Sequence, residues 1–353
     1  MTTLRDIAPM RLVAQRLAGP AADDVPAAVR RMTALQGQDF PGAVTSVALR
    51  TAGRRREDVL AALDAGAVVR SWPMRGTLHL VAAEDLPWLL ELLGPRAMAG
   101  LAGRRANLGL TEADAERARE LAVAALSGGR RLARAELLAA LEEGGVDISG
   151  QRGYHLLWFL AQTGTLCLGP TANGDQLFVL LDEWVREPRR PTRDDALAEL
   201  ALRYFRGHGP ATVRDLVRWA GSTVRDVRAG IAVVRDELAC LQVDGTEYFL
   251  DPETPDRYAA HREQAREPLL LPGFDEFVLG YGNREAALDP AFADRIVPGG
   301  NGVFQPTVVV DGRITGTWRF AGRGASRTVQ AEPFTTWDDE LAAAVPRLAA
   351  ALP

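Results

Sequence analysis

The feature of this 353-residue chain that most constrains its fold is a plan that recurs three times: helical segments followed by two short β-like runs. In the first copy, AVVRSW and GTLHLV, joined by PMR, predict a β-hairpin. The helical patterns before this hairpin cover Met10–Ala18, Val25–Ala34, a segment that opens at Pro41, and Arg56–Asp64. Helices that close with a β-hairpin are typical of a winged helix-turn-helix unit.

A helical connector at Ala83–Asn107 leads to the second and third copies of this plan. The second copy has TLCLG and QLFVLL as its hairpin, with the turn at Asn173-Gly174. After the charged, proline-rich linker EPRRPTRDD, the third copy has LACLQV and TEYFL, with the turn at Asp244-Gly245. The helices expected in these two copies are Glu112–Leu126, Arg134–Glu143, Gly153–Gln162, Asp194–Arg206, Thr212–Ala220 and Thr223–Glu237.

The C-terminal part departs from this plan. A hairpin in GVFQPTVVVDGRITGTWRF turns at Asp311-Gly312, RTVQAEPF adds a strand, and a helix at Asp339–Ala350 closes the chain. The sequence therefore predicts an α+β fold, mostly α, with three tandem winged helix-turn-helix domains and a C-terminal β-rich extension. We place the first domain with its connector at residues 1–108, the second at 109–190, and the third with the extension at 191–353.

Composition limits the chemistry available to the chain. All 41 basic residues are arginine, so no side chain can form a Schiff base. Cys167 and Cys240 lie in separate apolar stretches and predict buried, reduced thiols, and the four histidines show no metal-ligand spacing. Without a long apolar run or a signal peptide, we expect a cytoplasmic, nucleoid-associated protein that contacts no membrane.

The charge distribution favours a nucleic-acid partner, although the net charge is −5. Residues 1–81 hold 11 arginines against 7 acidic residues. Arginine suits bidentate phosphate contacts, so the run Arg54, Arg55 and Arg56 is a candidate DNA contact, and a solvated loop is the equal alternative. The same two interpretations hold for Arg319, Arg323 and Arg327 in the C-terminal sheet.

A short segment after the second predicted helix carries two amides around a glycine: Gln36-Gly37-Gln38. In extended geometry both amides face the same side of the chain. From the residues alone, ordinary polar residues at the end of a helix are the favoured explanation, although the glycine would let a ligand backbone approach closely.

Four segments together resemble the AlkZ-like/YcaQ family of winged-helix DNA glycosylases. The Q-x-Q segment looks like the catalytic motif of the AlkZ branch, whereas the YcaQ branch carries Asp in place of the second glutamine. Three further segments are similar to that family, in the same order along the chain: Met74–Val81, Leu271–Tyr281 and Pro306–Arg319. The middle residue, Gly37, departs from the larger apolar residue expected there.

This resemblance implies a DNA glycosylase that excises N7-alkylated purines, including bulky adducts or crosslinks made by genotoxic natural products. Gln36 and Gln38 would be its catalytic residues, and double-stranded DNA its partner. Arg75 and His79, within Met74–Val81, are further candidate DNA contacts. The resemblance implies no metal and no organic cofactor, and we expect a monofunctional enzyme that acts as a monomer.

Two other interpretations remain open on the sequence. The chain could be a non-catalytic DNA-binding protein such as a regulator or a damage sensor, although no clear dimerisation element is visible. Asp275 and Glu276 could supply a general base, but a helix cap or an ion pair is the more common role for such carboxylates. For His79, a packed histidine in a strand is favoured over a DNA contact.

Overall fold

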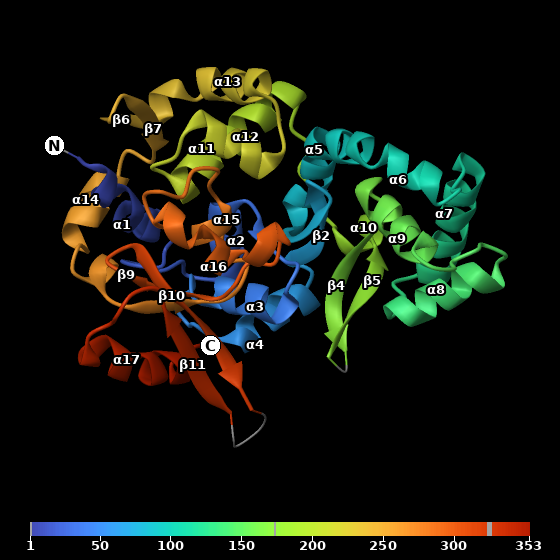
Figure 1. Ribbon diagram of the computed structural model, residues 1–353. Coiled ribbons are helices and arrows are strands. Elements are labelled where there is room, and N and C mark those ends of the chain that lie inside the picture. Colours follow the sequence, from blue (N-terminus) through green and yellow to red (C-terminus); the bar gives the residue numbers. More distant parts are fainter. Residues whose placement is uncertain (1, 173, 323–326) are drawn as a thin grey trace.

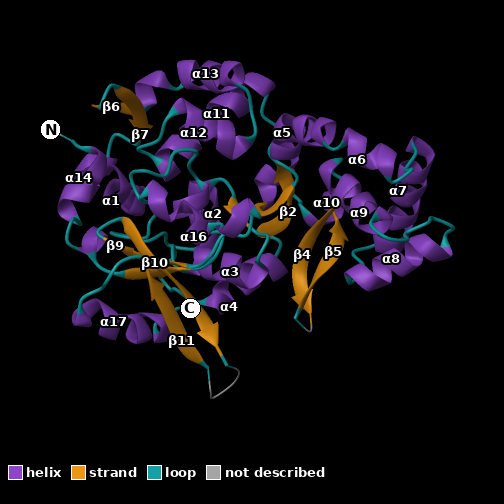
Figure 2. Ribbon diagram, viewed as in Figure 1, coloured by secondary structure: helices purple, strands orange, loops and turns teal. Residues whose placement is uncertain are grey.

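The computed structural model describes residues 2–172, 174–322 and 327–353 as a mixed α+β fold with many helices (Figures 1 and 2). Three groups of helices are each followed by a β-hairpin. The first unit contains α2 (Val25–Met32), α3 (Phe40–Ala48), α4 (Arg56–Asp64), β2 (Val68–Met74) and β3 (Thr77–Ala82). The second contains α7 (Glu112–Leu126), α8 (Arg134–Glu143), α9 (Arg152–Gln162), β4 (Leu166–Ala172) and β5 (Asp175–Leu180). The third contains α11 (Arg193–His208), α12 (Val213–Ala220), α13 (Val224–Val233), β6 (Ala239–Val243) and β7 (Thr246–Leu250).

The remaining elements connect or cover these units. The first and second units are joined by α5 (Leu86–Gly100) and α6 (Ala102–Asn107), as the helical pattern there predicts. The others are α1 (Leu4–Ala14), β1 (Leu35–Gln36), α10 (Leu181–Trp184), α14 (Thr254–Ala260), β8 (Leu269–Leu271), α15 (Glu276–Leu279), α16 (Ala293–Ile296), β9 (Thr307–Val310), β10 (Arg313–Ala321), β11 (Thr328–Pro333) and α17 (Asp339–Ala350).

The first two hairpins form one sheet, with strand order β1-β3-β2-β4-β5. They meet where Arg70 of β2 pairs with Leu168 of β4. The predicted division at residues 108 and 109 therefore separates two groups of helices but crosses a continuous sheet. The third hairpin stands alone as β6-β7, and the C-terminal extension forms the sheet β11-β10-β9-β8.

Helix α1 packs away from the unit that follows it in the chain. Its buried Ile7, Leu12 and Val13 belong to an apolar core that also contains Leu271 of β8 and Val309 of β9. The core of the first unit is formed instead by residues such as Val29, Val44 and Val59 of α2, α3 and α4. Helix α1 thereby shares a core with the C-terminal sheet, and Figure 1 shows it beside α14.

Local sequence signals explain several of these elements. Thr212 caps α12, accepting from the backbone N–H of Asp215, whose carboxylate accepts in return from the N–H of Thr212. The hairpin turns at Asp244-Gly245 and Asp311-Gly312 have the positive φ angles that such dipeptides favour. The predicted turn at Asn173-Gly174 includes Asn173, which lies outside the described residues.

Two expectations from composition, buried cysteines and no membrane-spanning helix, can be compared with the structure. Cys167 is buried and free, as expected, whereas Cys240 is only partly buried because it lies on the two-stranded third hairpin. Within the described ranges, no helix is long and apolar enough to cross a bilayer.

Candidate active site

The Gln36-Gly37-Gln38 segment lies along the edge of the first hairpin. Leu35 and Gln36 form β1, which pairs antiparallel with Leu80 and His79 of β3. The pairing continues for one more residue, because the backbone N–H of Gly37 donates to the carbonyl of Leu78 at 2.6 Å. Ladder pairing thus holds the segment in extended form on a buried strand.

Both glutamine side chains reach toward this hairpin. The Oε1 of Gln36 accepts from Nη2 of Arg75 at 3.3 Å, and the Oε1 of Gln38 accepts from the backbone N–H of Leu78 at 3.3 Å. Gln36 is 7% exposed, whereas Gln38 is exposed. A carbonyl oxygen has two lone pairs, so each amide oxygen retains one acceptor position for a water molecule.

Arg75 links Gln36 to His79. The Nη2 of Arg75 lies 3.2 Å from Nε2 of His79, and Nδ1 of His79 lies 2.9 Å from the carbonyl oxygen of Thr77. Since guanidinium can only donate, Nε2 of His79 must accept and Nδ1 must carry the proton. Burial, together with the charge of Arg75, lowers the pKa of His79 to about 3. The imidazole is therefore neutral and fixes the orientation of Arg75.

Glu276 binds the backbone of the same segment from the other end of the chain. Its Oε1 accepts from the backbone N–H of Gln36 at 2.8 Å, and its Oε2 accepts from Nε1 of Trp219 at 2.8 Å. The Nε2 of His208 lies 3.5 Å from Oε2. Burial alone would raise the pKa of Glu276, but these donors and the nearby histidines lower it to about 2. Glu276 is thus an ionised anchor that joins β1 to α12.

Asp275 is also committed to internal contacts. It caps α15 by accepting from the N–H of Phe277 at 2.9 Å, and it forms a bidentate pair with Arg50, with both contacts at 2.9 Å. Ser46 donates to it at 2.6 Å. Asp275 is thus both a helix cap and an ion-pair partner, as the sequence interpretation has it, whereas Glu276 accepts from the buried N–H groups of Gln36 and Trp219.

Of the two interpretations of His79, the structure agrees with the packed strand histidine, because this side chain is fully buried between Arg75 and the backbone of β3; a contact with DNA stays a prediction. Its position in a strand that pairs on both sides explains the burial, because β3 lies between β1 and β2. Arg75 is half-buried and donates to Gln36, so its role in DNA contact stays a prediction.

The other candidate arginines lie in different surroundings. Arg54 and Arg55 are exposed, and Arg55 lies 3.7 Å from Glu57, whereas Arg56 ties α4 to α3 by donating to the Pro41 carbonyl at 2.8 Å. In the C-terminal sheet, Arg319 and Arg327 are exposed, and Arg327 stacks 3.5 Å above the centre of the Phe320 ring. Arg323 lies outside the described residues.

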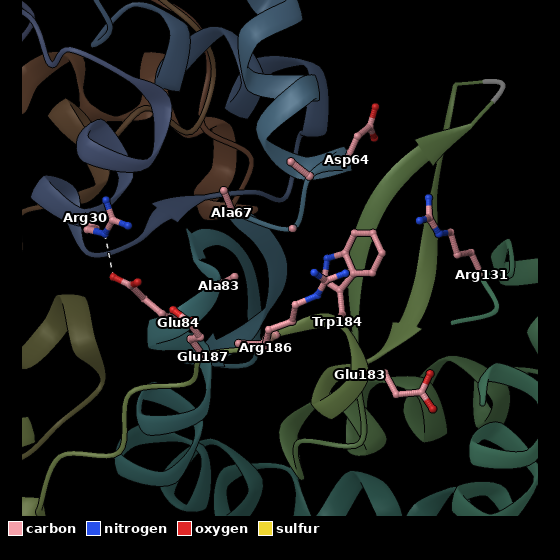
Figure 3. Close-up of a pocket in the computed structure, with 13 residues that line it drawn as sticks. Arg30, Asp64, Ala67, Ala83, Glu84, Arg131, Glu183, Trp184, Arg186 and Glu187 are labelled. Atoms are coloured by element: carbon pink, nitrogen blue, oxygen red, sulfur yellow. Dashed lines mark hydrogen bonds and ion pairs between the residues drawn. The ribbon is translucent and has the colours of Figure 1, made fainter. Parts of the chain in front are cut away.

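Two cavities lie at the junction of the first and second units. One, of about 400 Å³, is lined by Arg30, Glu84, Glu183 and Trp184 (Figure 3). Two of its charged residues have partners, since Arg30 contacts Glu84 at 2.7 Å and Glu183 accepts from the N–H groups of two glycines. The other, of about 550 Å³, is lined by residues that include Phe40, Arg70, Arg134 and Gln176 and adjoins the Q-x-Q segment.

The sequence analysis missed Arg70, which donates from Nε to the carbonyl of Gly37 at 2.7 Å. A signal for it was present, because Arg70 is the one charged residue in the mostly apolar strand VVRSWPM. The link from Glu276 to Gln36 had no local signal, since 240 residues separate the two. Among the described residues, no group of three or more His, Cys, Asp or Glu side chains is placed to hold a metal ion.

Comparisons with known proteins agree on one family. The family model for DNA glycosylase AlkZ-like proteins matches residues 29–352. An interstrand DNA cross-link repair glycosylase from Streptomyces sahachiroi is 29% identical over 313 residues, which cover 85% of this chain and 82% of the relative. The solved structure of the Streptomyces sahachiroi DNA glycosylase AlkZ superposes with a TM-score of 0.81 at 25% identity, covering 99% of this chain and 98% of that chain.

Proposed function

The chain belongs to the AlkZ-like family of DNA glycosylases, and from that membership we propose that it hydrolyses the N-glycosidic bond of N7-alkylated purines in duplex DNA. The product would be the free base and an intact abasic site. We further propose that the three helix-and-hairpin units are winged helices that together bind the duplex. The similar Streptomyces protein is named for cross-link repair, and bulky adducts or crosslinks are therefore the first substrates to test.

The chemistry of such a substrate suits neutral amides. Alkylation at N7 puts a positive charge on the purine, so the base leaves without a strong general acid. The remaining task is to hold a water molecule and to stabilise the positive charge that develops on the sugar. Amide oxygens do both without binding the ground state tightly.

The observation that carries the proposal is the arrangement of the two amide oxygens on one hairpin. Arg75 holds the Oε1 of Gln36, and the backbone of Leu78 holds the Oε1 of Gln38, each leaving one acceptor position. In this proposal Gln36 positions the attacking water. Gln38 orients the same water and faces the sugar as the bond breaks.

The nearby carboxylates are engaged in internal contacts, which leaves the amides as the groups that can face substrate. Glu276 is fully buried and its oxygens accept from the backbone N–H of Gln36 and from Trp219, so it anchors the segment without facing substrate. A site of neutral amides makes a poor general base, so purines without a charge on the base should be poor substrates.

The decisive test is single-turnover release of N7-methylguanine from a duplex, with DNA binding measured in parallel. Gln36→Ala and Gln38→Ala should each slow release by about a hundredfold, equivalent to ~3 kcal/mol, while DNA affinity changes little. Gln38→Asp should retain more activity than Gln38→Ala, because a carboxylate still binds water and a cation. Gln242→Ala, on the exposed face of β6, is the matched control and should release base at the wild-type rate.

The test also separates the competing function. A non-catalytic regulator or damage sensor would bind the duplex and release no base from any N7-alkylated or bulky-adduct substrate. Wild-type rates in both alanine variants would remove Gln36 and Gln38 from the catalytic role.

A further inference from the structure

Arg70 is a buried charge in the middle of an apolar strand, and its contacts show where that charge is directed. The side chain is 8% exposed, and β2 reads VVRSWPM around it. Its Nε donates to the Gly37 carbonyl at 2.7 Å, its Nη1 donates to Oε1 of Gln176 at 2.7 Å, and its Nη2 lies 3.5 Å from the Gln38 carbonyl. Burying a guanidinium is costly unless its N–H groups are paired, so these contacts compensate a real penalty.

The same guanidinium binds two backbone carbonyls of the segment, that of Gly37 and that of Gln38. Two N–H groups of the segment are held as well: that of Gly37 donates to the Leu78 carbonyl, and that of Gln36 donates to Glu276. Arg70 therefore completes a backbone clamp in which the donors and acceptors of the segment are fixed from two sides. A glycine between the two amides makes such a clamp necessary, because glycine restricts backbone rotation least.

The absence of a side chain at Gly37 leaves space for the Arg70 guanidinium. A Cβ built at position 37 would lie 3.3 Å from Nε of Arg70 and 3.3 Å from Cα of His79. These contacts are tight, so a side chain at position 37 would require the guanidinium or the backbone of His79 to shift by a few tenths of an ångström. The glycine and the arginine are thus a matched pair.

The third partner of Arg70 belongs to the second unit. Gln176 lies on β5, and β2 meets β4 at a single described residue pair that includes Arg70 itself. The contact between the first two hairpins and the contact to the Q-x-Q segment therefore share one side chain.

We propose that Arg70 is a positioning residue for the excision reaction: it fixes the Gly37 and Gln38 carbonyls, sets the direction of the two amides, and couples that geometry to the second hairpin through Gln176. This proposal rests on the proposed function, because it assigns Arg70 to the chemistry of Gln36 and Gln38. At neutral pH the group remains a cation, since burial and the nearby Arg134 lower its pKa only to about 10.

The first experiment compares Arg70→Ala, Arg70→Lys and Gln176→Ala in single-turnover release of N7-methylguanine. Arg70→Ala should lower the maximal rate by about tenfold to a hundredfold and leave the half-saturating DNA concentration within about threefold, because misplaced catalytic groups cost rate rather than binding. Arg70→Lys should fall in between, since an ammonium cannot bridge both partners in fork geometry. Gln176→Ala should lose less than Arg70→Ala.

Two further readouts distinguish positioning from a general loss of folding. Ethylguanidinium at millimolar concentration should restore part of the rate of Arg70→Ala, because the adjoining cavity opens the site to a small cation. Arg134→Ala is the matched control: Arg134 lines the same cavity but forms none of the recorded hydrogen bonds to the segment, and its variant should release base at the wild-type rate.

Backbone hydrogen exchange in residues 35–40 tests the clamp independently of activity. Arg70→Ala should speed exchange there, and Arg134→Ala should not. If the wild type releases no base but Arg70→Ala still speeds exchange, the proposed function fails and the clamp stands. If exchange in this segment and the maximal rate per folded molecule are both unchanged in Arg70→Ala, Arg70 is not a positioning residue.

Discussion

Replacing Asp275 with asparagine removes the only carboxylate that contacts the fully buried Arg50 among the described residues. Asp275 accepts from Nη1 and Nη2 of Arg50, from Ser46 and from the N–H of Phe277. Each carboxylate oxygen of Asp275 accepts from two of these donors. Asparagine replaces one of the oxygens with an NH₂ group, so the two donors that bound that oxygen would lose their acceptor. Arg50 would keep the Ser46 carbonyl and Oε1 of Gln15 as neutral partners.

The expected cost follows from the unpaired buried charge. Removing one partner of a buried ion pair typically costs about 3–5 kcal/mol, because the desolvation penalty of the other partner is no longer compensated. We expect Asp275→Asn to lower the free energy of unfolding by roughly this amount. The double variant Arg50→Met with Asp275→Asn should recover part of the loss, because the orphaned charge is then gone.

The assay is urea unfolding followed by tryptophan fluorescence, combined with single-turnover base release at a temperature where Asp275→Asn is folded. Release per folded molecule should fall by less than about tenfold, whereas removal of a general base would cost about 10²–10⁴-fold. Two results would refute the reasoning. One is a change in unfolding free energy below about 1 kcal/mol, and the other is a folded variant without activity.

Three further predictions concern pH, mechanism and binding. The folded state holds the pKa of His79 at about 3, below its usual 6.5, so stability is full above pH 6.5 and is lost as pH falls toward 3. Between pH 6.5 and about pH 4.5 the loss should be roughly 2 kcal/mol in thermal or urea unfolding, and His79→Gln should flatten this slope. Borohydride should trap no covalent enzyme–DNA adduct, because the chain has no lysine; a trapped adduct would contradict a monofunctional mechanism. Affinity for a lesion-free duplex, measured by fluorescence anisotropy, should fall steeply from about 50 mM to about 200 mM salt if arginine–phosphate contacts dominate, and a flat dependence would argue against them.

Local signals in the sequence were enough to place many helices to the residue. The patterns Arg56–Asp64, Glu112–Leu126, Arg134–Glu143 and Asp339–Ala350 correspond to α4, α7, α8 and α17 with identical bounds. Helix periodicity and capping residues act over a few neighbouring positions, which a single sequence displays directly. The same is true of the turns at Asp244-Gly245 and Asp311-Gly312, where two adjacent residues favour positive φ.

The candidate site was visible in the sequence only as a motif. Gln36 and Gln38 could be named because they match a family pattern, but their surroundings could not. His79 reads as a strand residue near a turn, and only the pairing of β1 onto β3 shows that its ring is enclosed. Arg70 stands out as a charge in an apolar strand, yet its partner Gln176 lies 106 residues further along the chain.

The sequence by itself determined the order of helices and hairpins, the exclusion of lysine chemistry and the identity of the two amides, because each depends on residue type or short-range spacing. Tertiary structure decided that the first two hairpins share a sheet, that α1 shares an apolar core with β8 and β9, and that Arg70 and Glu276 hold the Q-x-Q segment from opposite ends. Such contacts join positions tens to hundreds of residues apart. Whether two such positions come into contact depends on how whole helices and strands pack, and no local sequence pattern indicates that packing.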